Sequence, residues 1–148
     1  MARFRYGLQN ILDIKNKMET QAKQEFSSAM AALDEENSKM ELLQQRKAEL
    51  DDEAVRLLNG NLDFRDIDDN QLSRMLNDQK IADQRGAIKR AEAVLEKARQ
   101  NMANAVMERK TYEKLREKAF EEFMQEENRA ESKTIDELTS YVYGRKNT

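Results

Sequence analysis

The chain has 148 residues, 37% of them charged, a formal net charge of −3, and no proline, histidine or cysteine. The absence of histidine and cysteine excludes thiol nucleophiles, disulfides, most zinc sites and the usual general base near pH 7. Aromatic residues make up only 6% and leave little material for a thick core, while the interspersed charges favour neither nucleic acid nor an anionic membrane. The composition predicts a non-enzymatic helical protein without cofactor or metal.

Apolar residues recur with a seven-residue period from residue 8 to residue 57, and eleven of the fifteen core positions of this repeat are apolar. A 3.5-residue spacing sustained over many heptads is typical of a left-handed coiled coil. It predicts a first helix over about residues 4–58. The core positions are Leu8, Leu12, Lys15, Glu19, Ala22, Phe26, Ala29, Leu33, Glu36, Met40, Leu43, Lys47, Leu50, Ala54 and Leu57.

A break in the repeat predicts a turn over about residues 59–67. Asn59, Gly60 and Asn61 readily adopt the left-handed backbone conformation that ends a helix. Acidic and amide side chains downstream can cap the first turn of a new helix. The candidate caps are Asp66, Asp68, Asp69 and Asn70.

A second repeat predicts a helix over about residues 68–142, and eleven of its fifteen core positions are apolar. These positions are Ile81, Gln84, Ile88, Ala91, Leu95, Ala98, Met102, Ala105, Arg109, Tyr112, Arg116, Ala119, Phe123, Glu126 and Ala130. Gly86 interrupts this stretch, so residues 67–84 are either part of the helix or a separate short one. The predicted fold is all-α, a single antiparallel two-helix coiled-coil hairpin over residues 1–148 whose second helix is the longer.

The charged core positions Lys15, Glu19, Glu36, Lys47, Arg109, Arg116 and Glu126 are expected to fix the helix register or to extend their charged groups into water. A contact with a partner is the alternative. Beyond Phe120 the second helix outruns the first, which leaves apolar side chains uncovered and predicts a protein contact. A later turn near Gly86 would instead cover them.

Two terminal segments carry more specific patterns, F-R-Y-G-L-Q-N-I-L-D-I-K from Phe4 to Lys15 and R-A-E-S-K-T-I-D-E-L from Arg129 to Leu138. Together, on a hairpin of this length, they resemble the flagellar FliJ family. The resemblance implies a coiled-coil stalk component of the flagellar type III protein export apparatus, required for flagellum assembly and motility. It implies that the paired helix ends insert into the hexameric export ATPase without adding ATP chemistry.

Carried over residue by residue, the resemblance gives candidate contacts with two partners. The candidates for the ATPase are Phe4, Tyr6, Leu8, Gln9, Phe123, Lys133, Asp136, Glu137 and Leu138. Alternatively, Lys133 and Glu137 form only a solvated ion pair. The candidates for the cytoplasmic linker of the export-gate membrane protein are Leu72, Met75, Leu76 and Gln79. Alternatively, Leu72 and Leu76 cap the hairpin core by packing on Leu57 and Leu58.

The family also implies an escort role for export chaperones, which no residue here specifies. No apolar stretch approaches eighteen residues, so we expect no membrane insertion and a cytoplasmic protein at the membrane face of the flagellar base. Two other functions are compatible with the same helical hairpin and its uncovered apolar residues. One is a stalk of a virulence-type secretion system, and the other is a coiled-coil scaffold or prefoldin-like hairpin chaperone.

Overall fold

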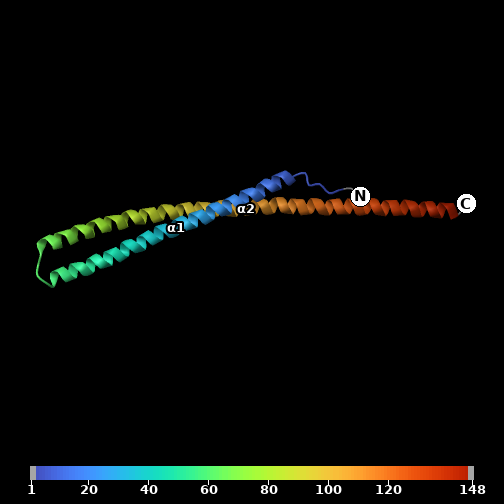
Figure 1. Ribbon diagram of the computed structural model, residues 1–148. Helices are drawn as coiled ribbons and strands as arrows, with labels where there is room; N and C mark the ends of the chain where they lie inside the picture. Colours follow the sequence, from blue (N-terminus) through green and yellow to red (C-terminus); the bar gives the residue numbers. More distant parts are fainter. Residues whose placement is uncertain (1–2, 147–148) are drawn as a thin grey trace. The chain divides into compact units, whose positions relative to one another are not determined.

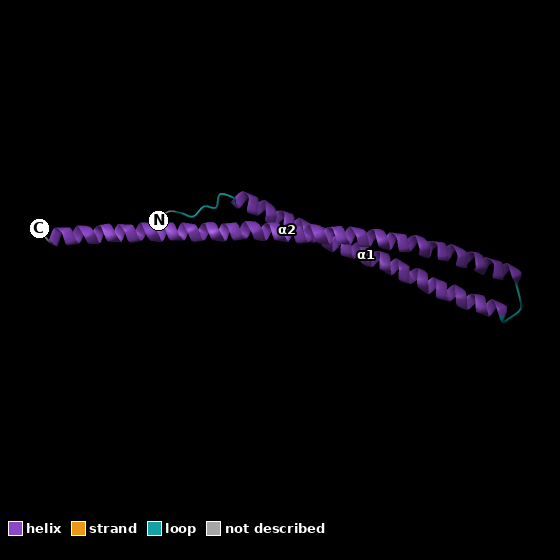
Figure 2. Ribbon diagram, turned by 180° about the vertical axis from the view of Figure 1, so that it is seen from behind, coloured by secondary structure: helices purple, strands orange, loops and turns teal. Residues whose placement is uncertain are grey.

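The computed structural model describes residues 3–146, which form two long helices, α1 (Gln9–Leu58) and α2 (Phe64–Lys146), joined by a short loop (Figure 1). Side-chain bonds from Asn70 to Leu50 and from Asn77 to Leu43 show that the helices run antiparallel, since the partner number falls as the donor number rises. No strand occurs in the described range (Figure 2). The predicted all-α hairpin with a longer second helix is confirmed.

Helix α1 begins at Gln9, five residues later than predicted. The Gln9 amide donates to the Tyr6 carbonyl at 3.1 Å, and the Leu12 amide donates to the Leu8 carbonyl at 3.0 Å. Residues 3–6 are not helical. The aromatic side chain of Phe4 packs on α2 instead, and this contact offsets the helical hydrogen bonds that the segment gives up.

Helix α1 ends at Leu58, just before the predicted Asn-Gly-Asn break, but by a different backbone conformation. Among residues 3–146 none, glycine included, has a positive φ. The Asn59 amide instead donates to the Arg56 carbonyl at 3.2 Å, and this tight turn closes the helix. The predicted left-handed ending was wrong.

Helix α2 begins at Phe64, four residues earlier than predicted. Its cap is Asp63, whose Oδ1 accepts a hydrogen bond from the Arg65 amide at 3.0 Å. Asp66 lies in the first turn, where its charge suits the helix dipole. The carboxylate nearest the loop therefore caps the helix, and the four candidates downstream lie within it.

Helix α2 continues through Gly86, so residues 67–84 do not form a separate helix. A glycine inside a helix costs only about 1 kcal/mol relative to alanine. Ile81, which is 7% exposed, and the half-buried Ile88 pack on either side of it. Their burial outweighs the local cost.

The residue contacts divide the chain into two units, and both helices contribute to each. The terminal unit comprises Met1–Thr20 and Ala103–Thr148, and the loop unit comprises Gln21–Met102. The core residues of the terminal unit include Leu12 and Ala105, and those of the loop unit include Ala22, Ala29, Met40, Leu50, Ile81 and Ala98. Alanine fills four of these eight buried positions, and among the described residues no side chain is less than 2% exposed, so neither unit has a thick core.

Candidate interaction surfaces

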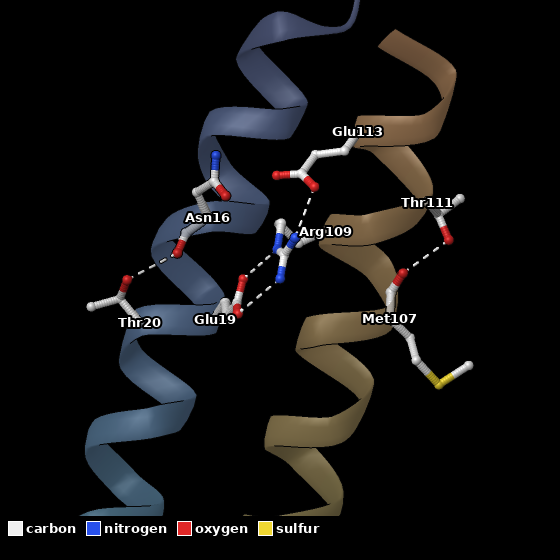
Figure 3. A network of polar contacts seen from close by, with 7 residues as sticks. All are labelled: Asn16, Glu19, Thr20, Met107, Arg109, Thr111 and Glu113. Carbon is white, nitrogen blue, oxygen red and sulfur yellow. Dashed lines mark hydrogen bonds and ion pairs between the residues drawn. The ribbon is translucent and has the colours of Figure 1, made fainter. Parts of the chain in front are cut away.

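Three charged side chains meet between the helices of the terminal unit (Figure 3). Arg109 of α2 donates from Nε to Glu19 of α1 at 2.7 Å and from Nη2 at 3.3 Å, and it donates from Nη1 to Glu113 at 2.8 Å. Glu19 is only 7% exposed. A carboxylate at this depth requires a charged partner, and the bidentate guanidinium supplies it. These bonds raise the pKa of Arg109, first through Glu19 and then through Glu113.

Other charged core positions also pair across the two helices. Lys15 donates to Glu108 at 2.9 Å, and this bond raises the pKa of the Lys15 ammonium. Arg116 donates from Nε to the Gln9 side chain at 3.1 Å. In the loop unit, the Lys47 Nζ lies 3.6 Å from the Asp78 Oδ1. Cross-helix pairing at these positions supports the predicted role in fixing the register.

Two aromatic residues that precede α1, Phe4 and Tyr6, contact α2 in the terminal unit. The Phe4 ring packs on Phe120 edge to face, with centroids 5.2 Å apart, and on Phe123 at 5.5 Å. The Tyr6 hydroxyl donates to the Tyr112 carbonyl at 3.1 Å. Of the ATPase candidates, Phe4, Tyr6, Gln9 and Phe123 therefore have partners within the chain, whereas Leu8 is 39% exposed.

The last part of α2 carries the remaining ATPase candidates. Every residue from 128 to 145 is exposed, and we call residues 128–145 the terminal segment. It presents Ile135, Leu138, Tyr141, Val142 and Tyr143, each more than half exposed. Uncovered apolar surface of this extent makes the segment a candidate for a protein contact.

The polar candidates Lys133, Asp136 and Glu137 lie on this same exposed segment. Lys133 and Glu137 are both exposed, one helical turn apart, and whether they bind a partner or are only solvated stays open to test. These side chains are separated from Phe123 by ten or more residues of helix, which is about 15 Å. The structure therefore places the ATPase candidates in two groups, one packed at Phe4 and one exposed.

The gate candidates form a stripe on the outer face of α2 in the loop unit. Leu72 is 55% exposed, Met75 63% and Leu76 51%, and Gln79 is exposed as well. Their i, i+3, i+4, i+7 spacing places them on one helical face, and the buried residues Asn70 and Asn77 occupy the face toward α1. The alternative was that Leu72 and Leu76 pack on Leu57 and Leu58; in the structure Leu72, Leu76 and Leu58 are each more than half exposed, while Leu57 is half-buried.

Three amide side chains of α2 bind backbone carbonyls of α1 at seven-residue intervals. The side-chain nitrogens of Asn70 and Asn77 each donate at 3.0 Å, to Leu50 and Leu43 respectively. Gln84 donates to the Glu36 carbonyl at 2.8 Å and also to the Glu36 carboxylate. The carboxylate bond is the main cause that lowers the pKa of Glu36.

Sequence reasoning missed Asn70 and Asn77 as interhelical residues. Extending the second repeat backward by two heptads from Ile81 and Gln84 reaches Ile67, Asn70, Arg74 and Asn77, so a signal was present. In the sequence Asn70 also suits a helix cap, and polar residues at core positions weaken an apolar pattern. Buried asparagine in a coiled coil is a known means of fixing register.

Together these features define an antiparallel helical hairpin with polar layers between its helices and apolar residues on its outer faces. The family model described as "Flagellar FliJ protein" matches residues 4–148. Because the match spans almost the whole sequence, the chain belongs to the FliJ family.

Comparison with solved structures finds the same fold in a YscO homologue from Chlamydia trachomatis. The TM-score is 0.76, the sequence identity is 18%, and the match covers 95% of this chain and 96% of the other. At 18% sequence identity this similarity shows a shared fold and nothing more. No curated protein matches. Over the described residues, neither helix has a stretch long and apolar enough to cross a membrane, and no cluster of acidic residues is arranged to hold a metal ion.

Proposed function

We propose that this FliJ-family protein acts without enzymatic activity of its own in the flagellar type III export apparatus, as a stalk-like subunit that links the hexameric export ATPase to the export gate. Family membership supports the flagellar role. On this proposal the protein works at the cytoplasmic face of the membrane through its partners. Flagellum assembly and motility then depend on it.

The observation that carries the proposal is the terminal segment, residues 128–145, where every residue is exposed and five large apolar side chains are uncovered. An apolar helix face of this kind is suited to docking in a hydrophobic site of a protein partner. We assign the ATPase contact to this segment, with Lys133, Asp136, Glu137 and Leu138 as its candidate residues. Phe4 and Phe123 act differently, because their ring contact packs Phe4 against α2.

The gate contact is assigned to the stripe of Leu72, Met75, Leu76 and Gln79. The stripe lies in the loop unit and the terminal segment in the terminal unit, so the two partners use different parts of the chain. Coupling between the ATPase and the gate then requires only that both contacts form on one molecule.

The test measures binding of the full chain to the purified export ATPase, together with ATPase activity. Leu138→Ser with Tyr141→Ser should weaken binding at least about tenfold, because both side chains are exposed and apolar. Met107→Ser is the matched control, since Met107 is 66% exposed in the same unit but outside the terminal segment.

A second arm measures binding to the cytoplasmic linker of the gate protein. Leu72→Ser with Leu76→Ser should abolish this binding and leave ATPase binding intact, and Val94→Ser is the matched control. If folded wild-type protein binds neither partner, the proposed function is wrong. Binding of unfolded client proteins instead would indicate a chaperone.

A further inference from the structure

A second group of uncovered apolar side chains lies at the loop between the helices, outside the stripe assigned to the gate. Val55 is 58% exposed, Leu58 65%, Leu62 56% and Phe64 74%. We call these four residues the loop-end patch. They fall within ten consecutive residues on either side of the turn, and Phe64 is the most exposed large apolar side chain of the described chain. A phenylalanine left in water at the first residue of a helix contributes little to the fold.

The charge around the loop-end patch is strongly negative. Residues 51–69 contain seven acidic and two basic residues, a net charge of −5, whereas the whole chain carries −3. The acidic residues of this stretch are Asp51, Asp52, Glu53, Asp63, Asp66, Asp68 and Asp69. The remaining 129 residues therefore carry +2, so the acidic charge is concentrated at this end of the hairpin.

Exposed apolar side chains within a strongly acidic stretch of the chain select one kind of partner. The negative charge repels nucleic acid and the anionic headgroups of a bilayer, which excludes both as occupants. It attracts a polypeptide rich in lysine and arginine, and four apolar side chains match the apolar face of a short amphipathic helix. Cytoplasmic segments next to membrane spans carry an excess of lysine and arginine, and helices that lie at the membrane surface add an apolar face to this basic charge.

We propose that the loop-end patch docks on a basic, amphipathic, membrane-proximal segment of a membrane protein. Leu58, Leu62 and Phe64 supply the apolar contact, and the surrounding carboxylates pair with lysine and arginine of the segment. The inference deepens the gate contact described above and rests on the proposed function only for the identity of the membrane protein. Its residues are different from Leu72, Met75, Leu76 and Gln79.

The test uses the full chain and a fluorescent eighteen-residue probe peptide of leucine and lysine, arranged to form one apolar and one basic helical face. In one control peptide glutamate replaces every lysine. In the other, the same residues are placed in a scrambled order that gives no apolar face. The wild-type protein should bind only the basic amphipathic probe. Raising the salt concentration from 50 to 300 mM should weaken that binding, because the charges are exposed.

Variants then locate the contact. The Leu58→Ser, Leu62→Ser, Phe64→Ser triple variant should bind the probe at least about tenfold more weakly, whereas Leu72→Ser with Leu76→Ser should bind like wild type. Circular dichroism controls for folding, since all five residues are more than half exposed. Lysine substitution of Asp52, Asp68 and Asp69, none of which caps α2, should reduce the salt dependence.

Three results would overturn the inference: equal binding of the glutamate peptide, unchanged binding by the triple variant, or binding of the protein to vesicles of anionic lipid alone. Failure of the proposed function gives a different pattern. In that case the probe still binds at the loop-end patch, while the gate linker does not bind.

Discussion

In the terminal unit a largely buried ion pair joins the helices, from Arg109 to Glu19. In the loop unit Asn70, Asn77 and Gln84 of α2 are neutral amides that donate to main-chain carbonyls of α1, and the Lys47–Asp78 ion pair lies on exposed side chains. An ion pair selects one particular side chain opposite, so it defines a partner. An amide that donates to a main-chain carbonyl tolerates any side chain at the partner position. It therefore sets the distance and the register between the two helices but does not select a partner residue.

The difference predicts different responses to mutation. Charge pairs leave a costly buried charge when one member is lost. Amides bonded to carbonyls can be replaced by apolar residues with less loss, because the carbonyl remains bonded within its own helix. The two units thus offer a direct comparison of ionic and neutral ways of fixing a coiled coil.

The largest effect is expected from Arg109→Met, which leaves the buried Glu19 without its guanidinium bonds. We expect the thermal unfolding midpoint to fall by about 5 °C at pH 7. Arg99→Met is the control, because Arg99 is 62% exposed and pairs only with Glu96 of its own helix, and it should change the midpoint by about 1 °C or less. Equal effects of the two changes would show that burial of Glu19 does not matter.

An intermediate effect is expected from Asn77→Ala, which removes the bond to the Leu43 carbonyl and should lower the midpoint by about 3 °C. Asn77→Leu should instead raise the thermal unfolding midpoint, while the helices lose part of their preference for a single register. The sequence has no cysteine, so Lys47→Cys with Asp78→Cys reports the register by the yield of crosslinking with a bifunctional thiol reagent that spans the distance now bridged by the two side chains. A wild-type crosslinking yield in the Asn77→Leu background would contradict the assigned role.

The smallest effect concerns pH and Glu36, whose pKa is lowered mainly by the Gln84 bond. A lowered carboxylate pKa stabilises the fold above the ordinary value of 4.5 and loses this contribution as the pH falls through the folded-state pKa. The midpoint difference between wild type and Gln84→Met should therefore narrow below pH 4.5. The residual difference at low pH measures the bond to the Glu36 carbonyl, which does not titrate. A difference that stays constant with pH would exclude the carboxylate contribution.

The sequence predicted the fold well, because the heptad pattern depends on burial, and burial dominates in a two-helix structure. Leu12, Ala29, Leu50 and Ile81 are buried as that pattern requires. The helix ends were predicted less well. Four acidic or amide residues suited the start of α2 equally, and only the path of the chain shows that Asp63 forms the cap.

The candidate contacts were only partly predictable. Spacing placed Leu72, Met75 and Leu76 on one face of a helix, but whether that face turned outward depended on the register of α2 against α1. The register in turn depends on Asn70 and Asn77, whose bonds to carbonyls leave no pattern in the partner sequence. The packing of Phe4 on Phe123 was also missed, since it joins residues 119 positions apart.

The repeat of three amides has a mechanical consequence. Because the bonds from Asn70, Asn77 and Gln84 recur every seven residues, sliding one helix along the other by less than a heptad breaks all three at once. A slide of one full heptad, about 10 Å, brings each amide opposite another core-position carbonyl. The two helices of the loop unit therefore resist small sliding movements. Under sufficient force, one helix would shift along the other by whole heptads.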